Sequence, residues 1–228
     1  MNEIQNQKKE VRKTIRELFV KNKEYCAEIK LAFENAKYVQ AFFEKLVSNK
    51  DYKTIFGYAE LPDEFPCLNL LKFFNLQKKK ITALPVVKGN ELIFREFNFT
   101  NEAEKTKKSK IEKSLVEGER FGILEPDKTC KEIFSTLSEV SETVQVQKLI
   151  EASPILVLTP ARAFTKDGAR LGRGGGFYDK LFAKLQHFQS IHSEIQFTAV
   201  GLVFSFQILE QIPTDARDFQ VHKVLTEK

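Results

Sequence analysis

A glycine-rich segment in the C-terminal third of the chain constrains the fold more than any other feature. Five of the thirteen residues from 167 to 179 are glycine, and the continuous apolar run 155–158 precedes them. The residues that follow, 177–188, have the apolar spacing of a helix, and 197–204 is a second apolar run. The order strand, loop, helix, strand predicts a doubly wound, mainly parallel sheet with helices on both faces.

The composition of this loop indicates that it binds phosphate. Glycine permits positive φ, so consecutive backbone N–H groups can turn inward and cradle an anion. The N-terminus of the following helix adds partial positive charge, and Arg170 and Arg173 add two guanidinium groups that match phosphate oxygens. The loop is neither a Walker A motif nor a dinucleotide fingerprint. A flexible surface turn is the alternative interpretation.

The remainder of the chain predicts elements that extend the same α/β fold. Gly89-Asn90 is a strong signal for a turn that reverses the chain between two apolar stretches. Apolar spacing and β-propensity predict helices at 8–20 and 25–47, a strand-helix-strand unit at 52–59, 67–76 and 81–87, a hairpin strand at 92–96, and a polar surface excursion at 98–122.

The bulk composition predicts one domain covering residues 1–228. A hydrophobic content of 42% can fill one sizeable core. The first twenty residues are too highly charged for a signal peptide or a membrane helix, so we expect a cytoplasmic protein without a membrane partner. The cysteines lie far apart without a C-x-x-C pair, which predicts reduced and mostly buried thiols at Cys26, Cys67 and Cys130.

The charge pattern argues against nucleic acid as a partner. The net charge of +5 comes from 36 basic and 31 acidic residues spread along the chain. RNA binding through the lysines at 78–80 and 105–113 is one alternative, but these lack the interleaved aromatic side chains that stack on bases. The histidines, His187, His192 and His222, show no spacing typical of a metal site or a catalytic triad.

Several motifs together resemble one known family. The stretch 160–164 followed by 167–179 resembles the signature of the 5-formyltetrahydrofolate cyclo-ligases, also called 5,10-methenyltetrahydrofolate synthetases. Segments 122–126 and 201–204 are similar to its central and C-terminal patterns, supported by Lys8, Arg12, Gln207, Ile212, Pro213 and Asp218. The resemblance implies a single-domain, three-layer α/β fold with a mainly parallel central sheet, of the NagB/RpiA-like type.

The resemblance also implies an activity. Members of this family use ATP and Mg²⁺ to cyclise 5-formyltetrahydrofolate to 5,10-methenyltetrahydrofolate, and they release ADP and phosphate. This chain is therefore expected to be a ligase of folate one-carbon metabolism, with Mg²⁺ as cofactor, ATP as co-substrate, small-molecule partners only and a monomeric state. A non-catalytic nucleotide- or polyanion-binding protein of the same fold is the alternative.

Site roles follow from the resemblance residue by residue. Arg173 is the expected catalytic group, and Asp179 and Asp218 are the expected metal ligands. The expected ATP-binding residues are Lys8, Arg12, Arg170, Leu171, Gly172, Arg173, Gly174, Gly175, Gly176, Phe177 and Tyr178. The expected folate-binding residues are Tyr58, Glu64, Arg173, Gly174, Gly175, Gly176 and Phe177.

Two of these roles have plain structural alternatives. Lys8 and Arg12 lie four residues apart, so they share a helix face that either reaches ATP or is simply solvated. Asp179, at the start of the predicted helix, either holds Mg²⁺ or interacts with the helix dipole.

Overall fold

The computed structural model of the protein describes residues 3–47, 50–99, 115–118, 122–137 and 140–228. In chain order its elements are α1 (Glu3–Lys21), α2 (Lys23–Ala32), α3 (Ala36–Val47), β1 (Thr54–Phe56), α4 (Leu68–Leu76), β2 (Ile81–Lys88), β3 (Glu91–Glu96), β4 (Leu115–Glu117), β5 (Leu124–Pro126), β6 (Glu132–Ser135), α5 (Glu142–Ala152), β7 (Ile155–Pro160), β8 (Ala163–Thr165), β9 (Arg170–Leu171), α6 (Phe177–Ile191), β10 (Phe197–Leu202), β11 (Ile208–Leu209) and β12 (Lys223–Leu225).

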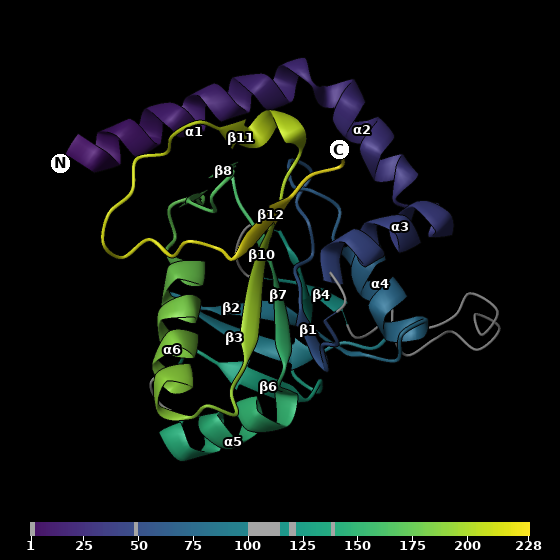
Figure 1. The fold of residues 1–228 in the computed structure, drawn as a ribbon, viewed down its shortest axis with the longest axis vertical. Coiled ribbons are helices and arrows are strands. Elements are labelled where there is room, and N and C mark those ends of the chain that lie inside the picture. Colours follow the sequence, from purple (N-terminus) through teal and green to yellow (C-terminus); the bar gives the residue numbers. More distant parts are fainter. Residues whose placement is uncertain (1–2, 48–49, 100–114, 119–121, 138–139) are drawn as a thin grey trace.

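A seven-stranded sheet, mostly parallel, forms the centre of the molecule (Figure 1). Its strand order is β12-β10-β7-β1-β2-β3-β6, and the five strands from β12 to β2 pair in parallel. β3 pairs antiparallel with both β2 and β6. The predicted mainly parallel α/β sheet is therefore confirmed.

Helices cover both faces of this sheet because its central strands are apolar on both sides. Ile155 to Leu158 in β7 are fully buried, as a strand between two helical layers requires. α5 and α6 pack on one face with a core that includes Leu149, Leu181 and Phe182. α3 and α4 pack on the other face with a core that includes Phe42 and Phe74. The result is a three-layer arrangement (Figure 1).

The topology opens a crevice between β1 and β7. β1 leads through α4 to β2 on one side, whereas β7 leads through α6 to β10 on the other. Connections that leave in opposite directions create a crevice at the carboxyl ends of the two strands, which is where open α/β sheets bind ligands. The residues that follow β1 and β7 are Gly57-Tyr58 and Ala161-Arg162.

Several predicted elements are confirmed. The strand-helix-strand unit is present as β1, α4 and β2, with β1 and β2 parallel. The reversal at Gly89-Asn90 joins β2 and β3 in an antiparallel hairpin, and Gly89 has φ +61°. The strand, helix and strand around the glycine loop are β7, α6 and β10, with β7 and β10 parallel.

The prediction of one continuous helix at 25–47 is wrong, because the chain forms two helices there, α2 and α3. Asn35 lies at the break, and its side-chain oxygen accepts the backbone N–H groups of Lys37 at 2.9 Å and Tyr38 at 3.4 Å. This is the bonding of a helix N-cap. The apolar spacing continues across the break since Phe33 and Val39 are both buried in one core.

Other elements were not predicted. The short strands β8 and β9 lie between β7 and the loop and form a small sheet with β11. β6, α5 and β12 complete the main sheet and its cover. Most of the predicted excursion 98–122 lies outside the described residues, but β4 within it pairs with β5.

The state of the cysteines and the character of the helices bear on the predictions made from bulk composition. The three thiols are unpaired, with Cys26 and Cys67 buried and Cys130 partly exposed. No described helix is both long enough and apolar enough to cross a bilayer.

His222, just before β12, gives the first prediction. Its Nδ1 accepts the backbone N–H of Ala199 at 2.9 Å, so the ring is neutral, and burial lowers its pKa. The stability that this contact provides is present above the unfolded pKa of about 6.5 and is lost as the pH falls through the lower folded value. An NMR titration should give a pKa for His222 below 6.5 and loss of protection at the Ala199 amide on protonation. A pKa at or above 6.5 would contradict the contact.

Candidate functional site

One large cleft of about 910 Å³ lies at the carboxyl ends of β1 and β7. Its lining comes mainly from α1, β2 and β3, the residues after β1, the end of β7, the glycine loop with the start of α6, and residues 215–220. All of the site residues predicted from the sequence border this cleft: Lys8, Arg12, Tyr58, Glu64, Arg170, Leu171, Gly172, Arg173, Gly174, Gly175, Gly176, Phe177, Tyr178, Asp179 and Asp218.

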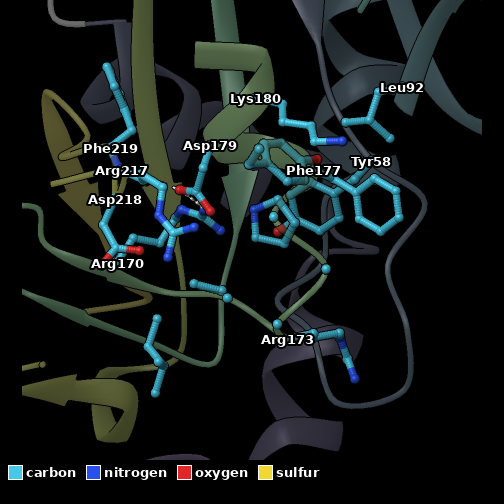
Figure 2. A pocket seen from close by; sticks show the side chains of 18 of the residues that line it. Tyr58, Leu92, Arg170, Arg173, Phe177, Asp179, Lys180, Arg217, Asp218 and Phe219 are labelled. Atoms are coloured by element: carbon cyan, nitrogen blue, oxygen red, sulfur yellow. Dashed lines mark hydrogen bonds and ion pairs between the residues drawn. The ribbon is translucent and has the colours of Figure 1, made fainter. Parts of the chain in front are cut away.

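The cleft has two chemically different ends, which Figure 2 shows side by side. At one end Tyr58, Phe177 and Leu92 present aromatic and aliphatic surface. At the other end Arg170, Asp179, Arg217 and Asp218 gather charged groups. Such a site can hold a ligand with a flat apolar part beside one with several negative charges.

Two cations at the charged end are buried and paired. Arg170 Nη2 lies 2.5 Å from Asp179 Oδ1, and the Arg170 side chain is only 5% exposed. Lys8 Nζ lies 2.5 Å from Asp218 Oδ2 and 3.2 Å from Asp215 Oδ2. Because charges buried at this depth are costly unless paired, these contacts fix where each cation sits.

Lys8 and Arg12 point into the cleft, so the structure does not support a solvated basic face. Lys8 is 4% exposed. Arg12 Nε donates to the backbone oxygen of Gly172 at 2.8 Å, which ties α1 to the glycine loop. Burial lowers the pKa of Arg12, and the nearby Asp218 acts in the opposite direction.

The glycine loop has the backbone geometry that its sequence predicts. Gly174 has φ +106° and Gly176 has φ +68°, conformations that residues with a Cβ rarely adopt. Gly176 is the N-cap of α6, so the helix begins directly at the cleft. The N–H groups of its first turn are therefore close to any anion bound there.

Arg173 lies in a cluster of ion pairs at the other side of the loop. Its Nε donates to Glu64 Oε1 at 3.0 Å, and its Nη2 is paired with Asp63 Oδ1. The second Asp63 oxygen is paired with Arg162 Nη1. Burial lowers the pKa of Arg173, but Glu64 and Asp63 outweigh it and raise the pKa above its ordinary value.

The segment that carries Glu64 is fixed by apolar packing and buried hydrogen bonds. The Phe65 ring lies 5.1 Å from that of Phe33 and 5.3 Å from that of Phe204. The Tyr58 hydroxyl donates to the Phe65 carbonyl at 3.0 Å. Glu64 Oε2 accepts the Leu61 N–H at 3.0 Å, so the carboxylate is held on both oxygens.

The start of α4 is capped by a side chain from outside the helix. Cys67 is the N-cap of α4 but makes no side-chain cap bond. Glu60 Oε2 instead accepts the N–H groups of Cys67 at 3.1 Å and Leu68 at 3.0 Å. The Glu60 carboxylate thus supplies the cap that the Cys67 side chain does not provide.

Burial raises the pKa of two tyrosines that line the cleft and of the buried Cys67. The pKa values of Tyr58, Cys67 and Tyr178 lie well above their ordinary values because burial disfavours their charged forms. Nearby acidic groups, including Glu64, act in the same direction. These three side chains are therefore neutral at physiological pH.

Asp179 and Asp218 fit a magnesium ion that arrives with a nucleotide rather than one held by the protein alone. Each carboxylate uses one oxygen in its ion pair, Oδ1 in Asp179 and Oδ2 in Asp218. No group of three or more candidate ligands occurs among the described residues. Mg²⁺ is typically bound by one or two carboxylates together with substrate phosphates, so two acidic residues are sufficient.

Sequence analysis missed several residues of the site. Arg217 and Asp215 line the cleft, and Asp215 has a pKa lowered to about 2, chiefly by the backbone N–H of Arg217. Their closeness in sequence to Asp218 is the feature from which they could have been predicted. Asp63 is paired with Arg173, and Arg162 is paired with Asp63. These residues could not be linked from the sequence because only the fold brings them together.

Two of the lysines considered for RNA binding make contacts elsewhere in the structure. Lys78 Nζ lies over the rings of Phe43 and Phe73, and Lys80 is paired with Asp51 at 2.6 Å. The lysines at 105–113 lie outside the described residues.

The fold and cleft together define an α/β protein whose cleft, at a topological switch point, is lined by several cationic side chains. Similarity to known families identifies one family within this class. The 5-formyltetrahydrofolate cyclo-ligase family matches residues 4–227, and the chain belongs to this family.

Relatives agree with this assignment. The 5-formyltetrahydrofolate cyclo-ligase of Mus musculus is 40% identical over 72 residues, which are 32% of this chain and 34% of the mouse protein. A probable 5-formyltetrahydrofolate cyclo-ligase of Schizosaccharomyces pombe is 24% identical over 185 residues, which are 74% of this chain and 79% of the yeast protein.

Solved structures show the same fold. A 5,10-methenyltetrahydrofolate synthetase of Aquifex aeolicus has 26% identity and a TM-score of 0.61, covering 97% of this chain and 90% of that chain. A 5,10-methenyltetrahydrofolate synthetase from Mycoplasma pneumoniae has 17% identity and a TM-score of 0.59, covering 97% and 99%.

The two tyrosines of the cleft floor give a matched prediction. Tyr58→Phe removes a buried hydrogen bond and should destabilise the protein by about 1–2 kcal/mol. The Tyr178 hydroxyl is buried without a hydrogen-bond partner among the described residues, so Tyr178→Phe should cost at most about 0.5 kcal/mol. Chemical unfolding of both variants measures the difference. Equal destabilisation would show that the Tyr178 hydroxyl has a partner.

Proposed function

We propose that this protein cyclises 5-formyltetrahydrofolate to 5,10-methenyltetrahydrofolate with ATP and Mg²⁺, releasing ADP and phosphate. The observation that carries the proposal is the cleft with an aromatic end and a charged end, bordered by the glycine loop (Figure 2). Its membership of the cyclo-ligase family supports this substrate pair.

The triphosphate would occupy the charged end. Among the described residues, six cationic side chains and four carboxylates line the cleft, an excess of two positive charges. MgATP carries about two net negative charges, so the balance favours it. Arg170 Nε is buried without a hydrogen-bond partner among the described residues and is one donor left for a phosphate oxygen.

The folate would occupy the aromatic end. Tyr58 and Phe177 offer ring surfaces for the flat pterin. Glu64 is 8% exposed, and its two oxygens can accept hydrogen bonds from an amino-pyrimidine edge. Since Phe177 has no hydroxyl, it contributes stacking surface without a hydrogen bond.

The reaction then needs mainly positioning and charge neutralisation from the protein. The formyl oxygen attacks the γ-phosphate and ADP leaves. N10 of the folate then attacks the activated formyl carbon, and the ring closes as phosphate leaves and N10 gives up its proton. Arg173 lies on the loop between the two ligands, and its Nη1, which makes none of its described ion pairs, is the donor left for the transferring phosphoryl group.

Mg²⁺, held by Asp179 and Asp218 together with the phosphates, would supply neutralisation of triphosphate charge. The protein's own side chains position this site: Lys8 and Arg170 orient the two carboxylates, and Arg12 on α1 binds the backbone of the glycine loop.

The remaining expectations belong to the same proposal. We infer a monomeric, cytoplasmic protein that acts on small molecules and does not bind nucleic acid. The near balance of 36 basic and 31 acidic residues supports the last point, as do the contacts of Lys78 with Phe43 and of Lys80 with Asp51.

Turnover gives the direct test. Purified protein incubated with 5-formyltetrahydrofolate, ATP and Mg²⁺ should show the near-ultraviolet absorbance rise of methenyl-folate. Arg173→Ala should lower kcat by roughly 10²-fold because it removes a donor to the transferring phosphoryl group. Absence of any rise at high protein concentration, with ATP still bound, would favour the non-catalytic binding protein.

A second test concerns the metal. Asp179→Asn keeps the shape of the side chain but removes the charge that neutralises Arg170, so stability should fall by about 2 kcal/mol, and half-maximal turnover should need more Mg²⁺. Thermal unfolding and a Mg²⁺ activation curve measure the two effects. Asp51→Asn, at an exposed ion pair with Lys80, is the matched control. An unchanged Mg²⁺ requirement would leave Asp179 only its structural role.

A further inference from the structure

Asp63 lies outside the cleft and forms ion pairs with two arginines. It does not appear among the cleft-lining residues, and neither does Arg162. One of its carboxylate oxygens is paired with Arg173 and the other with Arg162. A carboxylate shared in this way restrains both guanidinium groups at once.

We propose that Asp63 is a positioning residue that holds Arg173 in the orientation needed for phosphoryl transfer, with Arg162 as its anchor. The inference rests on the proposed function, because it gives Asp63 a task only if Arg173 acts on the transferring group. It assigns a role to two residues that make no contact with the cleft.

The anchor at Arg162 is rigid. Its backbone N–H donates to the Leu171 carbonyl at 2.8 Å, and its own carbonyl accepts from Gln207 Nε2 at 2.8 Å. Gln207 is itself 1% exposed. The Arg162 side chain is 12% exposed, so its guanidinium has little freedom once paired.

The base beneath Asp63 is rigid as well. Phe65, two residues along, is 1% exposed and packs among aromatic rings, and Tyr58 donates to its carbonyl. Supports of this kind, in which the residue behind a functional group is itself locked, are what precise sites require.

Arg173 needs such a restraint. Its side chain is 32% exposed and lies on a loop of glycines, so without partners it would sample many rotamers. Glu64 holds only its Nε, whereas Asp63 holds Nη2 and thereby fixes the plane of the guanidinium.

The charge state of Asp63 suits this task. Burial alone would raise its pKa, but hydrogen bonds from Arg173 and Arg162 outweigh burial and hold the pKa below its ordinary value. Asp63 and Glu64 together balance Arg162 and Arg173, so the group of four is neutral as a whole.

A double-mutant cycle on turnover tests the inference. Asp63→Asn should lower kcat roughly 10-fold with little change in the KM for ATP, since misplacement affects the transition state more than binding. In an Arg173→Ala background the same change should have almost no further effect, because Asp63 acts through Arg173. Arg162→Gln should lower kcat less than Asp63→Asn. The Asp51→Asn variant, at a distant exposed ion pair, should behave as wild type.

A readout independent of activity accompanies the kinetics. The guanidinium Nη2–H resonances of Arg173, which face Asp63, should be slow to exchange in the wild type and fast in Asp63→Asn, while thermal unfolding shows both to be folded. Unchanged Arg173 exchange, an unchanged kcat, or an equal loss of kcat in the Arg173→Ala background would each overturn the role of Asp63. If the wild type has no turnover the proposed function fails, and the exchange measurement still decides whether Asp63 restrains Arg173.

Discussion

Ion pairs between distant segments of the chain hold the cleft in shape. Arg170 and Arg173, both on the glycine loop, find their carboxylates on α6 and on the segment after β1, and Lys8 on α1 finds its partner at Asp218. Each of these cations is at least partly buried, so each would be costly without its partner. The pairs therefore bring five segments together and place donors where an anion can bind without large rearrangement.

The helix α1 belongs to the site for the same reason. As a helix at the edge of the fold it could have been a solvated cover, but Lys8 is buried and Arg12 binds the backbone of the glycine loop. Figure 1 shows α1 running alongside the C-terminal segment that carries β11. A ligand held between α1 and the loop would be enclosed from two sides, which favours exclusion of water during the proposed phosphoryl transfer.

How much could be predicted from the sequence depended on whether the signal was local. The glycine loop, the β1-α4-β2 unit and the turn at Gly89 have local signatures, and the structure confirms all three. The break at Asn35 was missed because the buried positions keep helical spacing across it, and the strands β8 and β9 were missed because two or three residues carry no measurable period. Asp63 and Arg162 were not given roles, since their pairing depends on where β1 and β7 end in the folded sheet.

The segment between β1 and α4 is fixed at both of its ends. Glu60 accepts the N–H groups of Cys67 and Leu68, so α4 begins directly after the segment that carries Glu64. Preserving that start matters because Asp63 and Glu64 lie in the segment between β1 and α4, and both ends of it must be fixed for their carboxylates to meet Arg173. Three kinds of contact therefore restrain the segment 57–67: the cap on α4, the packing of Phe65 and the ion pairs of Arg173. Because this segment follows directly from β1, its rigidity connects the central sheet to the residues of the proposed chemistry.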